Sequence, residues 1–181
     1  DAIVSEVMER SATPWISVAA VPDGKTVFAW GHGVPKIGEA ATVDPDTVFQ
    51  LASVSKSISA SVVAHEIGVG HVTWDTPAVA HLPWFALSDD FVTTHVTIAD
   101  LFAHRSGLPG QAGDLLESLG YDRRQILERL RLVPLTSFRD TYAYANFGLT
   151  AGGEAVAAAA GLDWADLAEK AIFKPLGMAS T

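Results

Sequence analysis

The sequence contains no cysteine, which excludes a disulfide scaffold, a cysteine-ligated zinc or iron–sulfur site, and a cysteine nucleophile. Basic residues are scarce, with 12 Lys and Arg against 21 Asp and Glu, and the net charge of −9 excludes nucleic acid as an expected partner because it repels phosphate backbones. Apolar runs are short of the roughly 18 residues that a membrane-spanning helix needs, so we expect no membrane span. The chain opens at Asp1 without methionine or a basic leader, so we expect a processed or trimmed product.

The composition predicts a folded domain with a substantial core, since 49% of the 181 residues are hydrophobic and only 18% are charged. The N-terminal part predicts a short helix, because Ile3, Val4, Val7 and Met8 recur on one helical face. Two apolar stretches, 15–21 and 26–30, flank the turn sequence PDGK and predict an antiparallel hairpin.

Helical patterns dominate the rest of the chain. We expect helices at 53–68, from 97 towards 106, at 122–132, at 146–160 and at 163–173. Thr97 and Asp100 have the spacing of a capping box. A two-stranded hairpin is not stable by itself, so this element order predicts that the hairpin pairs with strands that this chain does not contain.

The sequence Ser53-Val54-Ser55-Lys56 is the first candidate for chemistry. Residues three apart share a helix face, so the Ser53 hydroxyl and the Lys56 amine can meet. A serine needs an adjacent base to become a nucleophile, and a lysine in uncharged surroundings can act as that base. The non-functional alternative is a helix-capping serine followed by a surface lysine, which the spacing alone leaves open.

The sequence Tyr144-Ala145-Asn146 is the second candidate. A tyrosine beside a lysine cation can lose its proton, act as a general base and then return the proton to a leaving group. The Asn146 side chain offers a donor and an acceptor to a substrate amide. The alternative is a core aromatic residue followed by the N-cap of the helix at 147–160.

Four segments, in order, resemble the serine β-lactamase and penicillin-binding-protein superfamily, and most closely its class C β-lactamase-like group. They are FQLASVSK at 49–56, LFAHRSGLP at 101–109, YANFG at 144–148 and PLGM at 175–178. That group includes family VIII carboxylesterases, D-amino-acid amidases and peptidases, and DD-carboxypeptidases. The resemblance implies an α/β fold in which an all-helical lobe packs against an antiparallel sheet, completed by strands missing from this chain.

The same resemblance implies roles for individual residues. Ser53 would be the acylated nucleophile, Lys56 its proton partner, Tyr144 the general base or acid, and Asn146 a substrate-positioning residue. The Ser53 N–H would form half of an oxyanion hole, and His104 with Ser106 would be structural. The family's third motif, Lys- or His-x-Gly on a strand after the PLGM turn, has no counterpart here. We therefore expect a second polypeptide, or a downstream part of the same gene product, to supply it.

The resulting hypothesis is a serine hydrolase that forms an acyl-enzyme on an ester, an amide, a D-amino-acid peptide or a β-lactam. The alternative is a non-catalytic binding member or an incomplete fragment that retains the pocket without the full oxyanion hole. We expect residues 1–52 to belong to the sheet domain and 53–181 to form the helical lobe. No cofactor is expected. The six histidines lack a metal-ligand spacing, so no metal site is expected either. The expected location is periplasmic or secreted, with the cytoplasm as the alternative.

Overall fold

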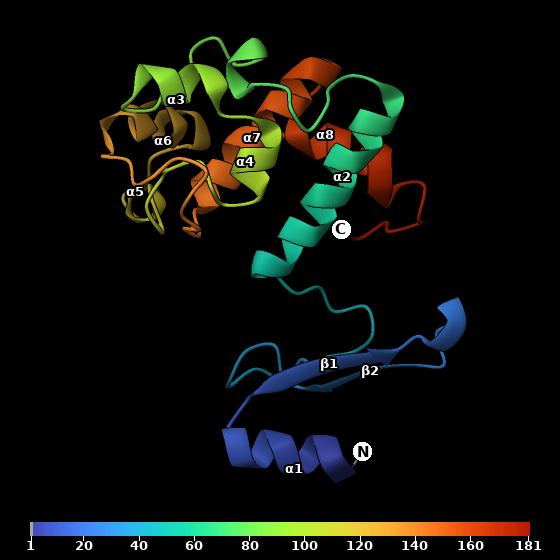
Figure 1. Cartoon of the computed structure of the whole chain (residues 1–181). Helices are drawn as coiled ribbons and strands as arrows, with labels where there is room; N and C mark the ends of the chain where they lie inside the picture. The colour runs from blue at the N-terminus through green and yellow to red at the C-terminus, as the bar shows by residue number, and fades with distance from the viewer. Residues whose placement is uncertain (1) are drawn as a thin grey trace. The chain divides into compact units, whose positions relative to one another are not determined.

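A computed structural model describes residues 2–181, which form two compact units at 2–50 and 51–181 (Figure 1). The first unit contains helix α1 (Ala2–Ser11), strand β1 (Trp15–Ala20), a 3₁₀ turn at Pro22–Gly24 and strand β2 (Phe28–Gly33). The strands pair antiparallel, from Trp15 opposite Gly33 to Ala20 opposite Phe28. The predicted helix and hairpin are thus confirmed. Gly24 has a positive φ of 73°, as the turn sequence requires.

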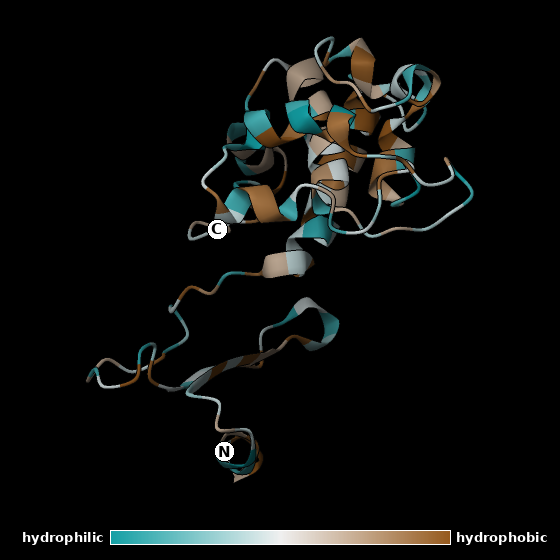
Figure 2. Cartoon of the chain, turned by 90° about the vertical axis from the view of Figure 1, so that its left-hand side faces the viewer, coloured by the Kyte–Doolittle hydropathy of each residue, from teal (hydrophilic) through white to brown (hydrophobic). Residues whose placement is uncertain are grey.

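Strand β2 continues three residues beyond the expected end at Trp30. The glycines that suggested a loop instead allow close backbone approach, since a Cβ on Gly31 would lie 2.7 Å from the backbone of Val43 and Asp44. Val43 is the one buried side chain among residues 2–50. Large apolar side chains of this unit, such as Val27 at 65% exposure, remain open to solvent. Figure 2 shows hydrophobic residues on both its helix and its strands.

The second unit is helical. Its elements are a 3₁₀ turn at Ala52–Val54, α2 (Ser55–Val69), α3 (Asp90–His95), α4 (Ile98–Phe102), α5 (Asp114–Ser118), α6 (Arg123–Arg129), α7 (Asn146–Ala160) and α8 (Trp164–Ala168), which continues into a π-helical turn at Glu169–Phe173. Short 3₁₀ turns lie at Ala78–Ala80 and Leu130–Leu132. Helices α3 and α5 have no counterpart among the sequence expectations.

Helix α7 lies at the centre of this unit. Phe147, Ala151 and Ala155 face one core cluster, which contains residues of α3, α4 and α6, whereas Val156 and Ala157 face a second cluster with residues of α2 and α8. Small residues allow this close packing: a Cβ on Gly152 would lie 2.9 Å from the Phe102 ring. The glycine- and alanine-rich sequence of α7 therefore reflects burial on most sides.

Local signals place several helix starts correctly. Thr97 and Asp100 form the predicted capping box at the start of α4. The structure excludes two capping alternatives that the sequence left open. Ser53 does not cap a helix, because it lies inside the 3₁₀ turn and α2 begins at Ser55. Asn146 is the first residue of α7 and makes no capping hydrogen bond.

Candidate active site

The turn before α2 presents the Ser53 hydroxyl at the surface of the helical unit. Ser53 is exposed, and Lys56, one helical turn further along, is half-buried. The Lys56 Nζ donates a hydrogen bond of 3.2 Å to Ser53 Oγ. Ala52, directly before Ser53, has a positive φ of 46°, which is costly for a residue with a Cβ. The predicted contact between Ser53 and Lys56 is thus present, and strained backbone precedes it.

Tyr144 lies on a segment without regular structure, which backbone hydrogen bonds fix to the turn after α4. Thr136 donates to the carbonyl of Gly107, and Arg139 donates to that of Arg105. Ala143 donates to the carbonyl of His104. These bonds replace the missing secondary-structure ladder, so the segment has a defined path up to Tyr144.

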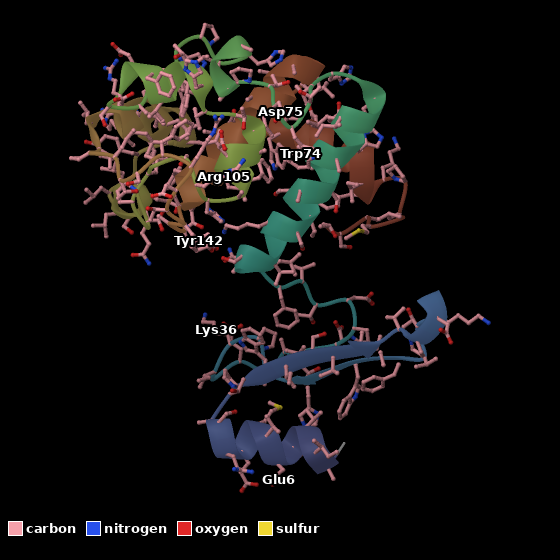
Figure 3. The ribbon with its side chains drawn as sticks, in the orientation of Figure 1. Glu6, Lys36, Trp74, Asp75, Arg105 and Tyr142 are labelled. Carbon is pink, nitrogen blue, oxygen red and sulfur yellow. The ribbon has the colours of Figure 1, made fainter. Side chains whose placement is uncertain are left out.

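A buried carboxylate anchors the same segment. Asp100 is 0% exposed and accepts hydrogen bonds from Arg105 Nε at 2.8 Å and from Arg139 Nε and Nη2 at 3.0 and 2.8 Å. Burial raises the pKa of Asp100, but the hydrogen bonds from Arg139 and Thr97 outweigh it and the net pKa is lowered. Arg105 is labelled in Figure 3. The two arginines, 34 positions apart, are thereby joined at one buried anion.

The Tyr144 hydroxyl meets the Ser53 hydroxyl at 2.7 Å. Lys56 Nζ also lies over the Tyr144 ring, 4.8 Å from its centroid. The neighbouring Lys56 and then the hydrogen bond with Ser53 lower the pKa of Tyr144, against burial and the charge of Asp114, which raise it. The three predicted side chains Ser53, Lys56 and Tyr144 therefore form one contact group, within a single compact unit.

The ring of His104 packs against that of Tyr144. It is 9% exposed, and its ring centroid lies 4.6 Å from that of Tyr144. The Ala145 N–H donates to His104 Nδ1 at 3.2 Å, so Nδ1 is the acceptor nitrogen. Burial, then the Lys56 charge, lowers the pKa of His104. A neutral His104 is compatible with this packing, and its ring also contacts that of Tyr142, which is labelled in Figure 3.

Asn146 does not contact the serine directly in this arrangement. Its Nδ2 donates to Asp114 Oδ2 at 2.7 Å. Asp114 begins α5 and was not among the residues expected from the sequence. Only its hydrogen bond with Asn146 in the folded chain identifies it as part of the site, because an aspartate at the start of a helix is common.

Backbone strain gathers around this group. Besides Ala52, His104 and Gln111 have positive φ values of 55° and 60°. The Gln111 N–H donates to the Tyr144 carbonyl at 2.8 Å, so the strained turn before α5 supports the tyrosine backbone. Non-glycine residues in this conformation are typical of sites where the surrounding structure fixes functional groups.

A lysine ammonium only donates, so Ser53 Oγ accepts the hydrogen bond from Lys56. In the bond between Ser53 Oγ and Tyr144 Oη either hydroxyl can be the donor, and Ser53 is the donor when Tyr144 is ionised. A lowered pKa increases the fraction of Tyr144 that is ionised and able to accept that proton. The arrangement can therefore move a proton from Ser53 to Tyr144.

Within residues 2–181, no three His, Cys, Asp or Glu side chains are placed to hold a metal ion together. Over the same residues, no helix combines the length and apolar character needed to cross a membrane.

Within the helical unit, Ser53 and Lys56 of the Ser-x-x-Lys segment contact Tyr144 of the Tyr-x-Asn segment. This unit and the two-stranded antiparallel sheet have a β-lactamase/transpeptidase-like fold. Two solved structures share it. The octameric penicillin-binding protein homologue from Pyrococcus abyssi has a TM-score of 0.83 and 22% identity over 98% of this chain and 42% of its own. FmtA from Staphylococcus aureus has a TM-score of 0.80 and 19% identity over 97% of this chain and 48% of its own.

The Beta-lactamase family model matches residues 1–181, and the chain belongs to that family. The predicted fold class is thus confirmed. Unguisins hydrolase ungD' of Aspergillus campestris is 29% identical over 99% of this chain and 35% of its own length. Penicillin-binding protein 4 of Amycolatopsis lactamdurans is 30% identical over 91% of this chain and 43% of its own length. The chain therefore spans less than half the length of these relatives.

Proposed function

We propose that this chain carries the acyl-accepting half of a serine hydrolase. The observation that supports the proposal most directly is the pair of contacts at Ser53 Oγ, 2.7 Å to Tyr144 Oη and 3.2 Å to Lys56 Nζ. These two contacts give the serine a proton acceptor and a nearby positive charge, which are the two requirements of an activated hydroxyl.

In the proposed reaction, Tyr144 begins as the phenolate, and Ser53 Oγ forms a bond to the substrate carbonyl carbon while its proton passes to the ionised Tyr144 Oη. The carbonyl electron pair moves to oxygen and gives a tetrahedral oxyanion, which the Ser53 N–H stabilises. Collapse of this intermediate breaks the bond to the leaving group, which takes the proton from Tyr144. Water then attacks the acyl-serine ester, releases the acid and restores the Ser53 hydroxyl. Lys56 keeps its positive charge beside Ser53 throughout and lowers the cost of negative charge on Tyr144.

We propose that the substrate is an ester, an amide, a D-amino-acid peptide or a β-lactam. The name of the Aspergillus campestris relative contains the word hydrolase, and that of the Amycolatopsis lactamdurans relative contains penicillin-binding. Both names are compatible with acyl transfer from a carbonyl group to a serine. Asn146 would contact the substrate amide or its equivalent through the donor and acceptor of its side chain.

Further strands and a second oxyanion donor are part of the proposal. Strands β1 and β2 form a two-stranded sheet whose outer edges have no partner strand among residues 2–181. Such a sheet is marginal in water. The helical unit has an apolar groove of about 420 Å³ lined by side chains that include Ile58, Trp164 and Phe173. We infer that a second polypeptide, or a downstream part of the same gene product, adds strands and a Lys- or His-x-Gly motif across an interface above about 2,000 Å².

Covalent labelling tests the proposal. A fluorophosphonate and a fluorescent penicillin are applied to the wild-type protein and to Ser53→Ala, and the adduct is located by mass spectrometry of peptides. An adduct on Ser53 supports the proposal. A folded wild-type protein that takes neither reagent with its proposed strand partner present would favour a binding-only member of the family. Hydrolysis of nitrocefin, p-nitrophenyl esters and D-amino-acid anilides then separates the substrate classes.

A further inference from the structure

Asp114, the first residue of α5, contacts Asn146 of the Tyr-x-Asn segment. Its Oδ2 accepts the 2.7 Å hydrogen bond from Asn146 Nδ2, across 32 positions of sequence. Its Oδ1 is buried and has no hydrogen-bond partner among the described residues. A buried carboxylate oxygen without a partner lowers stability, so its presence needs a compensating role.

The turn before α5 holds Asp114 in a fixed place. Gly113 has a φ of 91°. A Cβ at Gly113 would lie 2.8 Å from Ile126 Cγ2 and 3.1 Å from the Phe147 ring. Gly113 therefore packs directly against α6 and α7, next to Asn146. Gln111, at the other end of the same turn, donates its N–H to the Tyr144 carbonyl. The carboxylate is thus tied to the Tyr-x-Asn segment through its side chain and through its backbone.

An ionised carboxylate accepts hydrogen bonds and never donates them. Only the NH₂ side of the Asn146 amide can therefore face Asp114. The carboxylate partner therefore decides which end of the Asn146 amide is the oxygen and which is the nitrogen. The remaining N–H and the Oδ1 of Asn146 are left for other partners.

We propose that Asp114 is a positioning residue that fixes the orientation of the Asn146 amide for substrate recognition. The proposal rests on the proposed function, because it assigns Asn146 to the substrate. Asp114 itself touches neither Ser53 nor Lys56 in the structure. Its effect reaches the reaction through Asn146 and, as a charge, through Tyr144.

The charge of Asp114 gives an independent readout. Tyr144 is contacted by Lys56 from α2, by the Ser53 hydroxyl and by the ring of His104. The charge of Asp114, at the start of α5, also acts on it. Lys56 lowers the pKa of Tyr144, and Asp114 opposes it. Removal of the carboxylate charge in Asp114→Asn should therefore lower the pKa of Tyr144. The part of the pH profile in which kcat/KM rises as Tyr144 ionises, its rising limb, should therefore move to lower pH. A purely structural role would leave this limb in place.

The test is a double-mutant cycle in the complete protein with its strand partner. Asp114→Asn, Asn146→Ala and the double variant are compared by kcat and KM on the best substrate of the hydrolysis panel. We expect Asp114→Asn to lower kcat/KM about 10- to 100-fold, mainly through KM, because a neutral amide can present either its oxygen or its NH₂ to Asn146 and no longer fixes the orientation of that side chain. In the Asn146→Ala background the same substitution should change kcat/KM less than about threefold, because the route through Asn146 is already removed and only the effect of the Asp114 charge on Tyr144 remains.

Glu117→Gln is the matched control, since Glu117 is an exposed acid on the same short helix. It should leave kcat/KM and the pH limb unchanged. Equal losses from Asp114→Asn in both backgrounds, or an unmoved pH limb, would overturn the inference. Failure of the proposed function is separate: a wild-type protein with no Ser53 adduct refutes acyl transfer, whereas a labelled protein with an inert Asp114→Asn variant refutes only the role of Asp114.

Discussion

The hydroxyls of Ser53 and Tyr144 lie 2.7 Å apart although 91 positions separate them in the chain. Ser53 is placed by the 3₁₀ turn that starts α2, and Tyr144 by the hydrogen-bonded segment that follows the turn after α4. No local feature of the sequence brings the two residues together. The short contact is therefore a product of the packing of α2 against α7, whose first turn Tyr144 precedes.

Ser53→Ala should abolish covalent labelling and lower turnover by several orders of magnitude. The reason is that no other hydroxyl takes its place between Lys56 and Tyr144 in the contact group. Ser53 is exposed, so its loss should leave the fold intact. Near-UV circular dichroism checks the fold, and the fluorophosphonate adduct checks the chemistry. Retention of more than a few per cent of the activity would contradict the assignment of the nucleophile.

Lys56→Arg should nearly abolish acylation while it preserves the charge. The guanidinium is larger than an ammonium and places its donors differently. The 3.2 Å contact to Ser53 Oγ would not be reproduced. Single-turnover acylation by a p-nitrophenyl ester measures the effect. An arginine variant that acylates at the wild-type rate would show that Lys56 is a structural residue.

Tyr144→Phe removes one oxygen and little volume, so the free energy of unfolding should change by less than about 1 kcal/mol while acylation or deacylation slows strongly. The pH dependence of kcat/KM gives a second test of Tyr144, through Lys56. Lys56 lowers the pKa of Tyr144, so Lys56→Met should raise it and move the rising limb of kcat/KM to higher pH. Burst kinetics across pH separate the two steps. Wild-type kinetics for the phenylalanine variant would return Tyr144 to the role of a packing residue.

Local signals in the sequence predicted much of this arrangement. The spacing of Ser53 and Lys56 and the capping box at Thr97 depend on neighbours within one helical turn, so the sequence carries them directly. The alternative that Asn146 caps a helix is excluded, because its side chain contacts Asp114, 32 positions away, and makes no capping hydrogen bond. Such a contact depends on packing of α5 against α6 and α7, and no periodicity encodes it. The length of β2 was missed for the same reason, since Gly31 serves a nonlocal approach to Val43.

Asp100→Asn should destabilise the helical unit by about 1–3 kcal/mol, because Arg105 and Arg139 would lose their shared anion and the segment before Tyr144 its anchor. Both arginines are about half exposed, which keeps the loss below that of a fully buried pair. The midpoint of urea unfolding measures the change. Asp140→Asn, at an exposed site next to Arg139, is the control and should shift stability by no more than about 0.5 kcal/mol. Equal effects of the two substitutions would show that Asp100 is not an anchor.

Glu66 provides a pH-dependent stabilisation at the far end of α2. Its carboxylate is 3% exposed and contacts His71 Nδ1 at 2.5 Å and His65 Nδ1 at 2.9 Å. Burial raises the pKa of Glu66, but the contacts with the two histidines outweigh it and the net pKa lies below the ordinary value of 4.5. A lowered pKa means that folding favours the ionised form, so this stabilisation is fully present above about pH 4.5.

The stabilisation should be lost as the pH falls through the folded-state pKa of Glu66. Glu66→Gln should therefore lower the thermal midpoint near neutral pH, where its removal costs about 1–3 kcal/mol, and the difference between the wild-type and variant midpoints should shrink as the pH falls through the lowered pKa of Glu66. Glu128→Gln, which breaks the exposed pair with Arg124, is the control and should shift stability by at most about 1 kcal/mol at any pH. Differential scanning calorimetry from pH 3 to 8 gives both curves. A difference between wild type and Glu66→Gln that stays constant over this range would show that the stabilisation does not come from the ionised carboxylate, and the two histidines would then act through packing alone.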